Sequence, residues 1–163
     1  MAKSGKKIKT NAVRILERES ISYELMEYNI NDGVIDGVSV AEKTGQSVEV
    51  VYKTLVTKAN PGELFIFLLP LAHELDLKKA AKAAGVKKID MLPLSDLTKE
   101  TGYVRGGCSA VGMKRSYPTF IDDSAQRLGE MIVSAGLPGL QMKLAPEALA
   151  RVTSAVFNDL VKD

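Results

Sequence analysis

The sequence contains very little cysteine and histidine, and no tryptophan. Cys108 is the single cysteine and His73 the single histidine among 163 residues. These counts exclude an intramolecular disulfide framework and zinc sites built from clusters of cysteine and histidine. A Ser-His or Cys-His catalytic pair would have to use His73. We therefore expect a protein of a reducing compartment that holds no metal.

Long apolar runs and an excess of one charge are also lacking. Lysine and arginine total 22 against 20 acidic residues, a formal net charge of +2. Overall charge therefore does not predict a binder of nucleic acids or membranes, and any polyanion contact must be local. We expect neither DNA nor a membrane as a partner. The longest apolar run, 64–72, is too short to span a bilayer, and no apolar stretch of a secretory signal follows the basic opening. We expect a cytoplasmic location.

Hydrophobic residues make up 45% of the chain, which is sufficient for a core. We expect a flexible basic lead at 1–8 and a single compact domain at 9–163. Predicted helices and hairpin-linked strands are interspersed without a βαβ repeat, so the predicted fold class is α+β with a mixed sheet. The helices are expected at 12–19, 40–44, 76–85, 93–100, from 146 and at 155–161, and the strands at 21–28, 48–57, 63–71, 86–91, 119–122, 130–134 and 140–144.

Lys53 lies in the middle of an otherwise apolar predicted strand. Its ammonium group either faces solvent or points into a cleft. Burial in a cleft is costly unless an anion or an oxygen ligand meets the charge, so such a placement indicates a use. An outward-facing strand lysine is the simpler alternative.

The segment 102–112 is rich in glycine and small residues. Glycine pairs let backbone N–H groups point into a shared concavity that can hold an oxyanion, a carboxylate or a phosphate. The segment has neither the Gly-x-Gly-x-x-Gly spacing nor the lysine spacing of a Walker phosphate loop, which disfavours a phosphate-loop enzyme. A glycine-rich turn between two elements is the alternative. Cys108 in this segment is a candidate nucleophile, but no activating partner is evident and a small buried hydrophobe is the simpler interpretation.

A diffuse group of basic residues lies on the predicted helix at 76–85, just after that helix, and after the glycine segment. If these residues share one face, they form a local surface that can bind several phosphates. A solvated helix face is the alternative. The group consists of Lys78, Lys79, Lys82, Lys87, Lys88, Lys114 and Arg115.

Four ordered motifs resemble the YbaK/EbsC family of aminoacyl-tRNA deacylases, with a more distant similarity to the prolyl-tRNA synthetase editing domain. They are Tyr-Lys-Thr-Leu at 52–55, the lysine- and alanine-rich segment 75–88, the glycine segment 101–112 and Val-Ser-Ala-Gly-x-x-Gly-Leu at 133–140. The resemblance runs from about Thr10 to the end of the chain. It implies a mixed, partly barrel-like sheet surrounded by helices.

The resemblance also implies roles for particular residues. Lys53 falls on the key lysine of the family, and Gly106 and Gly107 would supply the backbone amides of its pocket. The expected substrate-binding positions are Tyr28, Ser134, Cys108, Ser109 and Ala110. The chain departs from the family pattern at Ala110, where proline is usual, at Pro138, where arginine is usual, and near Asp36, where a phenylalanine is expected.

The activity implied by the resemblance is trans-editing of mischarged tRNA without metal or organic cofactor. The expected substrate is Cys-tRNA(Pro), and also Cys-tRNA(Cys), cleaved by attack of the substrate's own thiol, with prolyl-tRNA synthetase as a partner. An ester is already activated, so its cleavage needs alignment and charge stabilisation more than a protein nucleophile. The alternatives are another mischarged tRNA such as Ala-tRNA(Pro), attacked by a bound water, and a non-catalytic regulatory module that binds tRNA.

Overall fold

The computed structural model describes residues 9–28, 41, 45–60 and 62–163. The predicted lead at 1–8, Asp36 and the helix at 40–44, apart from Ala41, lie outside the described residues. The helices are α1 (Asn11–Arg18), α3 (Leu77–Ala84), α4 (Leu97–Thr101) and α5 (Pro146–Thr153), with short 3-10 turns at Leu94–Asp96 and Asp123–Arg127. The strands are β1 (Glu24–Glu27), β2 (Tyr52–Ala59), β3 (Glu63–Pro70), β4 (Asp90–Met91), β5 (Thr119–Asp122), β6 (Met131–Leu137), β7 (Leu140–Leu144) and β8 (Val156–Asn158).

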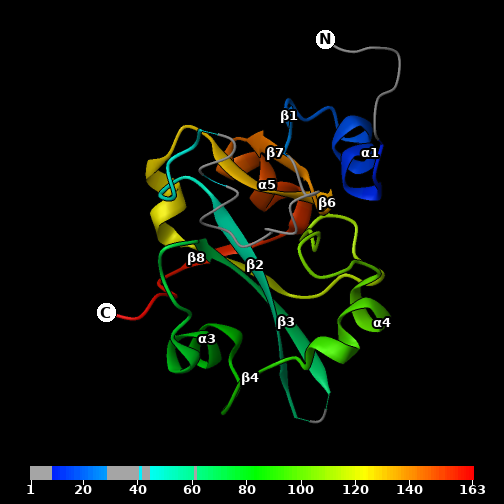
Figure 1. Ribbon diagram of the computed structural model, residues 1–163. Helices are drawn as coiled ribbons and strands as arrows, with labels where there is room; N and C mark the ends of the chain where they lie inside the picture. The colour runs from blue at the N-terminus through cyan, green and yellow to red at the C-terminus, as the bar shows by residue number, and fades with distance from the viewer. Residues whose placement is uncertain (1–8, 29–40, 42–44, 61) are drawn as a thin grey trace.

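The strands form two sheets, with orders β1-β7-β6 and β4-β2-β3-β5-β8 (Figure 1). The larger sheet is mixed, because β5 pairs in parallel with both β3 and β8 while β2 pairs antiparallel with β3 and β4. The two sheets join where Val51 forms a parallel bridge with Ile132, whose N–H donates to the Val50 carbonyl oxygen at 2.9 Å. The predicted α+β class with a mixed sheet is confirmed, and the described strands do not close into a barrel.

Local capping fixes the helices that the sequence predicts best. Asp76 accepts hydrogen bonds from the N–H groups of Lys78 and Lys79, and Gly85 ends α3 in the left-handed conformation with φ 73°. The Thr10 hydroxyl caps α1 by accepting from the Val13 N–H, and it also donates to the Ala135 carbonyl oxygen at 2.6 Å. One threonine thereby caps the start of the helix and anchors the helix to β6.

The predicted helix at 155–161 is wrong. Residues Val156–Asn158 form β8, which pairs in parallel with β5. Helix α5 stops because Ser154 adopts the left-handed conformation with φ 58°. The Asp122 carboxylate then accepts a hydrogen bond from the Leu160 N–H, which keeps the following chain beside the sheet. Pairing with a buried neighbour outweighs the weak local helical signal.

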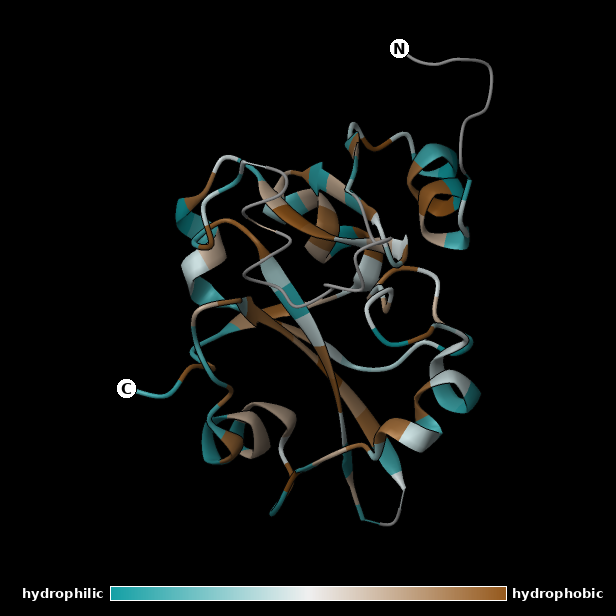
Figure 2. Cartoon of the chain, viewed as in Figure 1, coloured by the Kyte–Doolittle hydropathy of each residue, from teal (hydrophilic) through white to brown (hydrophobic). Residues whose placement is uncertain are grey.

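The core occupies both faces of the larger sheet. Strand β3 is buried from Leu64 to Pro70 and sends alternate side chains to two clusters, as its brown colour in Figure 2 reflects. Ile66 and Leu68 face the cluster shared with α1 and the smaller sheet, whereas Phe65, Phe67 and Leu69 face the cluster under α3. Strand β2 pairs along its whole length with this doubly buried strand.

Among the described residues, no helix is long and apolar enough to cross a membrane.

Candidate functional site

A cavity of about 250 Å³ lies where the two sheets meet. Its walls come from the end of β1, the start of β2, the end of β3, the glycine segment, β6 and β7. The lining residues are Tyr28, Val51, Tyr52, Lys53, Thr54, Leu71, Gly106, Cys108, Ser134 and Gln141. Segments that are distant in the sequence therefore converge on one small hollow.

Five of the eight residues predicted for the site line this cavity. They are Lys53, Gly106, Tyr28, Ser134 and Cys108. Gly107, Ser109 and Ala110 are not among the lining residues, and Ala110 instead lines a separate groove. The cationic side chain and the glycine segment thus share one space.

Lys53 reaches the cavity from the first part of β2, where it pairs with Leu69 of β3. Partial burial lowers the pKa of its ammonium group, and the charge of Glu74 opposes that effect. Glu74 itself forms its ion pair with Lys162 at 3.0 Å, and among the described residues no carboxylate lies within ion-pair distance of Lys53. Within the described residues, the cavity therefore contains a cation that is partly desolvated and not neutralised by a direct partner.

The glycine segment packs tightly against the turn between β6 and β7. A Cβ atom at Gly107 would lie 2.6 Å from Cδ of Pro138 and 2.7 Å from the carbonyl carbon of Leu137. The Gly107 N–H donates to the Val104 carbonyl oxygen at 2.9 Å, so this amide is already used. Gly106 has φ 83°, and within the described part of the chain neither its N–H nor that of Cys108 has an acceptor. Neither amide is therefore engaged by a described residue.

The residues after Cys108 anchor the segment. The Ser109 hydroxyl is buried and accepts from the Val111 N–H at 3.1 Å. The Tyr103 hydroxyl donates to the Val111 carbonyl oxygen at 2.6 Å, and the Asn11 amide donates to the Gly112 carbonyl oxygen at 2.8 Å. Ser109 therefore stabilises the segment without lining the cavity. The segment has one face on the cavity and another on the groove that Ala110 lines.

Residues 35–152 match the family model described as an aminoacyl-tRNA editing domain. The chain belongs to this aminoacyl-tRNA editing family. It is 43% identical over 160 residues to EbsC of Enterococcus faecalis, a candidate Cys-tRNA(Pro)/Cys-tRNA(Cys) deacylase, with 98% of each chain covered. The predicted family resemblance is thereby confirmed, and the editing family acts on mischarged tRNAs.

Solved structures share the fold of this editing domain. The crystal structure of a candidate trans-editing enzyme for prolyl-tRNA synthetase has a TM-score of 0.80 at 22% identity, covering 96% of this chain and 100% of the other. A hypothetical protein, APE2540, has a TM-score of 0.85 at 18% identity, covering 94% of this chain and 100% of the other. At these identities the likeness shows the fold alone.

Five residues that line the cavity of this editing domain were missed by the sequence analysis: Val51, Tyr52, Thr54, Leu71 and Gln141. Two of them have polar groups left unused by the fold, because the Thr54 hydroxyl oxygen and the Gln141 amide oxygen are buried without a hydrogen-bond partner among the described residues. Gln141 is opposite Ser134 in the pairing of β7 with β6. The segment 140–144 alternates apolar residues with two polar ones, Gln141 and Lys143, so its pattern did not single out Gln141.

Cys108 lines the editing domain cavity as a protonated thiol. Burial raises its pKa to about 11, although a hydrogen bond with Thr101 acts in the opposite direction. A thiol with this pKa is almost fully neutral at pH 7 and is a poor nucleophile. Its placement agrees with a wall of the site rather than with an attacking group.

The single cysteine allows a direct test of this pKa. Because Cys108 has a pKa of about 11 in place of the ordinary 9.0, we expect iodoacetamide alkylation of the native protein to rise with a midpoint near that higher pH. The unfolded chain in denaturant serves as the control and should titrate near the ordinary value. Rapid alkylation of the native protein at pH 7 would show an activated thiol and contradict the assignment.

The predicted basic surface is partly used within the protein. Lys79 forms ion pairs with Asp159 at 3.0 Å and Asp163 at 3.1 Å, and these partners raise its pKa. Lys114 donates to the Lys99 carbonyl oxygen at 3.0 Å. Two of the seven basic residues are therefore engaged by the fold itself.

Proposed function

We propose that this editing domain is a deacylase that removes cysteine from Cys-tRNA(Pro), and also from Cys-tRNA(Cys), in trans. The observation that carries the proposal is the meeting of the Lys53 ammonium with the Gly106 segment in one cavity. The relationship to EbsC, itself a candidate deacylase of these two tRNAs, supports the choice of cysteine. A cytoplasmic location and prolyl-tRNA synthetase as a partner belong to the same proposal.

The reaction needs no nucleophile from the protein. The cysteinyl thiol attacks its own ester carbonyl carbon, a carbon–sulfur bond forms, and the bond from that carbon to the ribose oxygen breaks. The thiol proton ends on the ribose hydroxyl, and the released thiolactone then opens in water to free cysteine. Positioning and charge stabilisation suffice for such a step, and both can come from fixed donors.

Lys53 and the glycine segment have separate roles in this scheme. The Gly106 N–H, together with the Cys108 N–H, stabilises the oxyanion that develops on the carbonyl, while the Lys53 ammonium positions the ester end of the tRNA and opposes its negative charge. Gly107 serves by close packing on Pro138 and Leu137, which sets the segment in place. Ser109 supports the segment by accepting a hydrogen bond from the Val111 N–H, whereas Ala110 lies on the separate groove.

The cavity's size and walls fit a small aminoacyl group. Its volume of about 250 Å³ leaves little room beyond a short side chain and the ester, and Tyr28, Ser134 and Cys108 border it. Size alone discriminates weakly, because one methylene changes binding by only ~1–3 kcal/mol. The substrate-thiol route adds a chemical requirement that alanine and serine cannot meet.

A deacylation panel tests the proposal. Purified protein is mixed with Cys-tRNA(Pro), Cys-tRNA(Cys), Ala-tRNA(Pro) and Cys-tRNA(Pro) whose thiol is alkylated, with and without prolyl-tRNA synthetase. We expect cleavage of the two free-thiol substrates only. Cleavage of Ala-tRNA(Pro) would favour water attack on another substrate, and tRNA binding with no turnover would favour a regulatory module.

Gln141 provides a sharper test of the cavity. Its unpartnered oxygen is suited to accept a hydrogen bond from the α-ammonium group of the substrate. We expect Gln141→Leu to lower kcat/KM for Cys-tRNA(Pro) by about 10- to 100-fold, the value of one hydrogen bond to a charged group. The free energy of unfolding should not fall, because the variant removes a buried oxygen that has no partner.

Asn158→Leu is the matched control, because Asn158 also has a buried unpartnered oxygen but does not line the cavity. It should leave deacylation unchanged. Equal effects of the two substitutions on activity, or a large loss of stability in Gln141→Leu alone, would show that Gln141 acts only through the fold.

A further inference from the structure

A second concavity, larger than the candidate site, lies on the other face of the glycine segment. We call it the arginine groove, and its volume is about 570 Å³. It is formed by the end of α1, the end of α5 and residues 110–119. The segment 106–119 therefore separates two concavities, with Gly106 and Cys108 on the first and Ala110 on the second.

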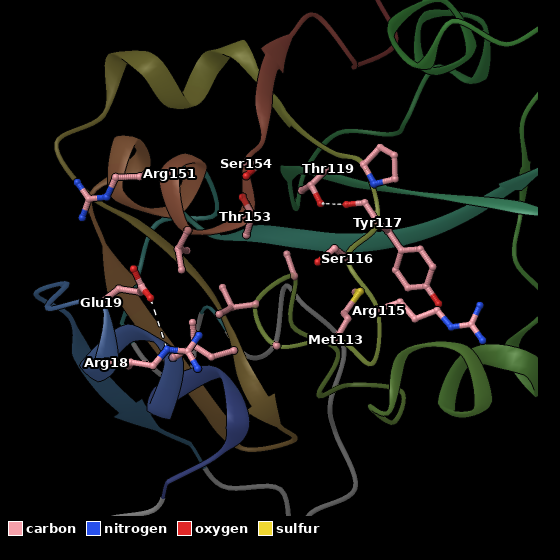
Figure 3. A pocket seen from close by; sticks show the side chains of 16 residues that line it. Arg18, Glu19, Met113, Arg115, Ser116, Tyr117, Thr119, Arg151, Thr153 and Ser154 are labelled. Atoms are coloured by element: carbon pink, nitrogen blue, oxygen red, sulfur yellow. Dashed lines mark hydrogen bonds and ion pairs between the residues drawn. The ribbon is translucent and has the colours of Figure 1, made fainter.

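The charge of the arginine groove is positive at its rims. Figure 3 shows Arg18 and Arg151 on one side and Arg115 on the opposite side. Glu19 is the single acidic side chain among the described lining residues, and it pairs with Arg18 at 3.4 Å. Within the described residues Arg115 and Arg151 have no acidic partner. In Figure 3 the Arg115 and Arg151 side chains extend outward on opposite sides, so two exposed guanidinium groups flank the groove.

The space between these rims is neutral and polar. Ser116, Thr153 and Ser154 lie between the arginines in Figure 3. A chain with phosphates at both rims and a sugar and base between them matches the distribution of charge.

We propose that the arginine groove binds the RNA backbone of the tRNA, with one nucleotide in the middle and its flanking phosphates at Arg115 and at Arg18 and Arg151. This inference rests on the proposed function for its partner, but not on the chemistry of deacylation. Arginine contacts to phosphate fix position without reading sequence, so the groove would orient any tRNA whose acceptor end enters the cavity. The anchored segment between the two concavities would hold both contacts in fixed relation.

The test measures binding and cleavage separately. Binding of uncharged fluorescent tRNA(Pro) is followed by anisotropy at several salt concentrations for the native protein and for the double variant Arg115→Gln/Arg151→Gln. We expect the variant to bind about tenfold more weakly or worse, and the slope of log affinity against log salt to fall by about 0.7–0.9 for each phosphate that the variant no longer neutralises. Cleavage of 3′-cysteinyl adenosine, which lacks the tRNA body, should be unchanged.

Lys87→Gln/Lys88→Gln is the matched control, since it also removes two exposed positive charges and lies outside the arginine groove. Equal weakening by both double variants, or weakening by the lysine variant alone, would overturn the proposal. Tight ATP binding that depends on Arg115 and Arg151, with tRNA affinity unchanged, would also overturn it. If the native protein does not cleave 3′-cysteinyl adenosine, the proposed function is contradicted. The binding measurement still decides whether the arginine groove binds tRNA.

Discussion

Replacing Lys53 by alanine is expected to slow the cleavage of Cys-tRNA(Pro) by about 10²–10³-fold, the usual loss on removing one preorganised stabiliser of transition-state charge. The cavity has no second cation among its described lining residues, so none of these residues can replace the ammonium group. Single-turnover deacylation at saturating protein measures the effect on the chemical step. Full activity in Lys53→Ala would remove Lys53 from the site.

Lys58→Ala is the control, because Lys58 lies on the same strand but is exposed and outside the cavity.

The loss of activity in Lys53→Ala should not come from unfolding, since burial lowers the pKa of Lys53 and the fold therefore disfavours its charge. The unfolded state binds more protons in the interval just below the ordinary value of 10.5. Stability of the native protein should accordingly rise with pH there, and that rise should be absent from Lys53→Ala.

Gly107→Ala is expected to cause the second large loss of activity. The added Cβ would lie 2.6 Å from both Cδ and the backbone nitrogen of Pro138, a contact that real Cβ atoms do not make. Much of this contact is backbone, so the glycine segment must move away from the turn between β6 and β7. We expect a loss of about 1–3 kcal/mol in the free energy of unfolding, as for overpacking in a core, and at least a tenfold loss of kcat as Gly106 leaves its position.

Gly129→Ala is the comparison for this substitution, because a Cβ there meets nothing within 4 Å. It should leave stability and activity close to native values. Denaturant unfolding and deacylation kinetics on both variants make the comparison. Native kcat in Gly107→Ala, with its stability lowered, would show that the position of the segment does not govern the reaction.

The elements that the sequence predicted best are those whose signals are local. The capping aspartate and terminal glycine of α3 and the proline that starts α5 act within a few residues, and the structure has each of them. Strand β8 was missed because its pairing partner, β5, is more than thirty residues earlier. The bridge between Val51 and Ile132 that joins the sheets is equally invisible to local pattern.

Residues of the site were likewise predictable only where a local pattern or the family resemblance indicated them. An isolated lysine in an apolar strand pointed to Lys53, and the family resemblance supplied Tyr28 and Ser134, which the fold brings to the same cavity. The difference between Gly106 and Gly107 could not be predicted, since it depends on the contact of Gly107 with Pro138 and on its hydrogen bond to Val104. Adjacent glycines look equivalent in a sequence, and packing from a distant turn separates them.

The central claim is that the cavity beside Lys53 and Gly106 receives the aminoacyl end of the tRNA. The most direct measurement is the amide spectrum of ¹⁵N-labelled protein titrated with an adenosine that carries cysteine through a stable 3′-amide bond. The account predicts saturable shifts at the N–H groups of Gly106 and Cys108, which disappear in Lys53→Ala. Binding of this ligand that shifts other regions and leaves both amides unchanged would contradict it.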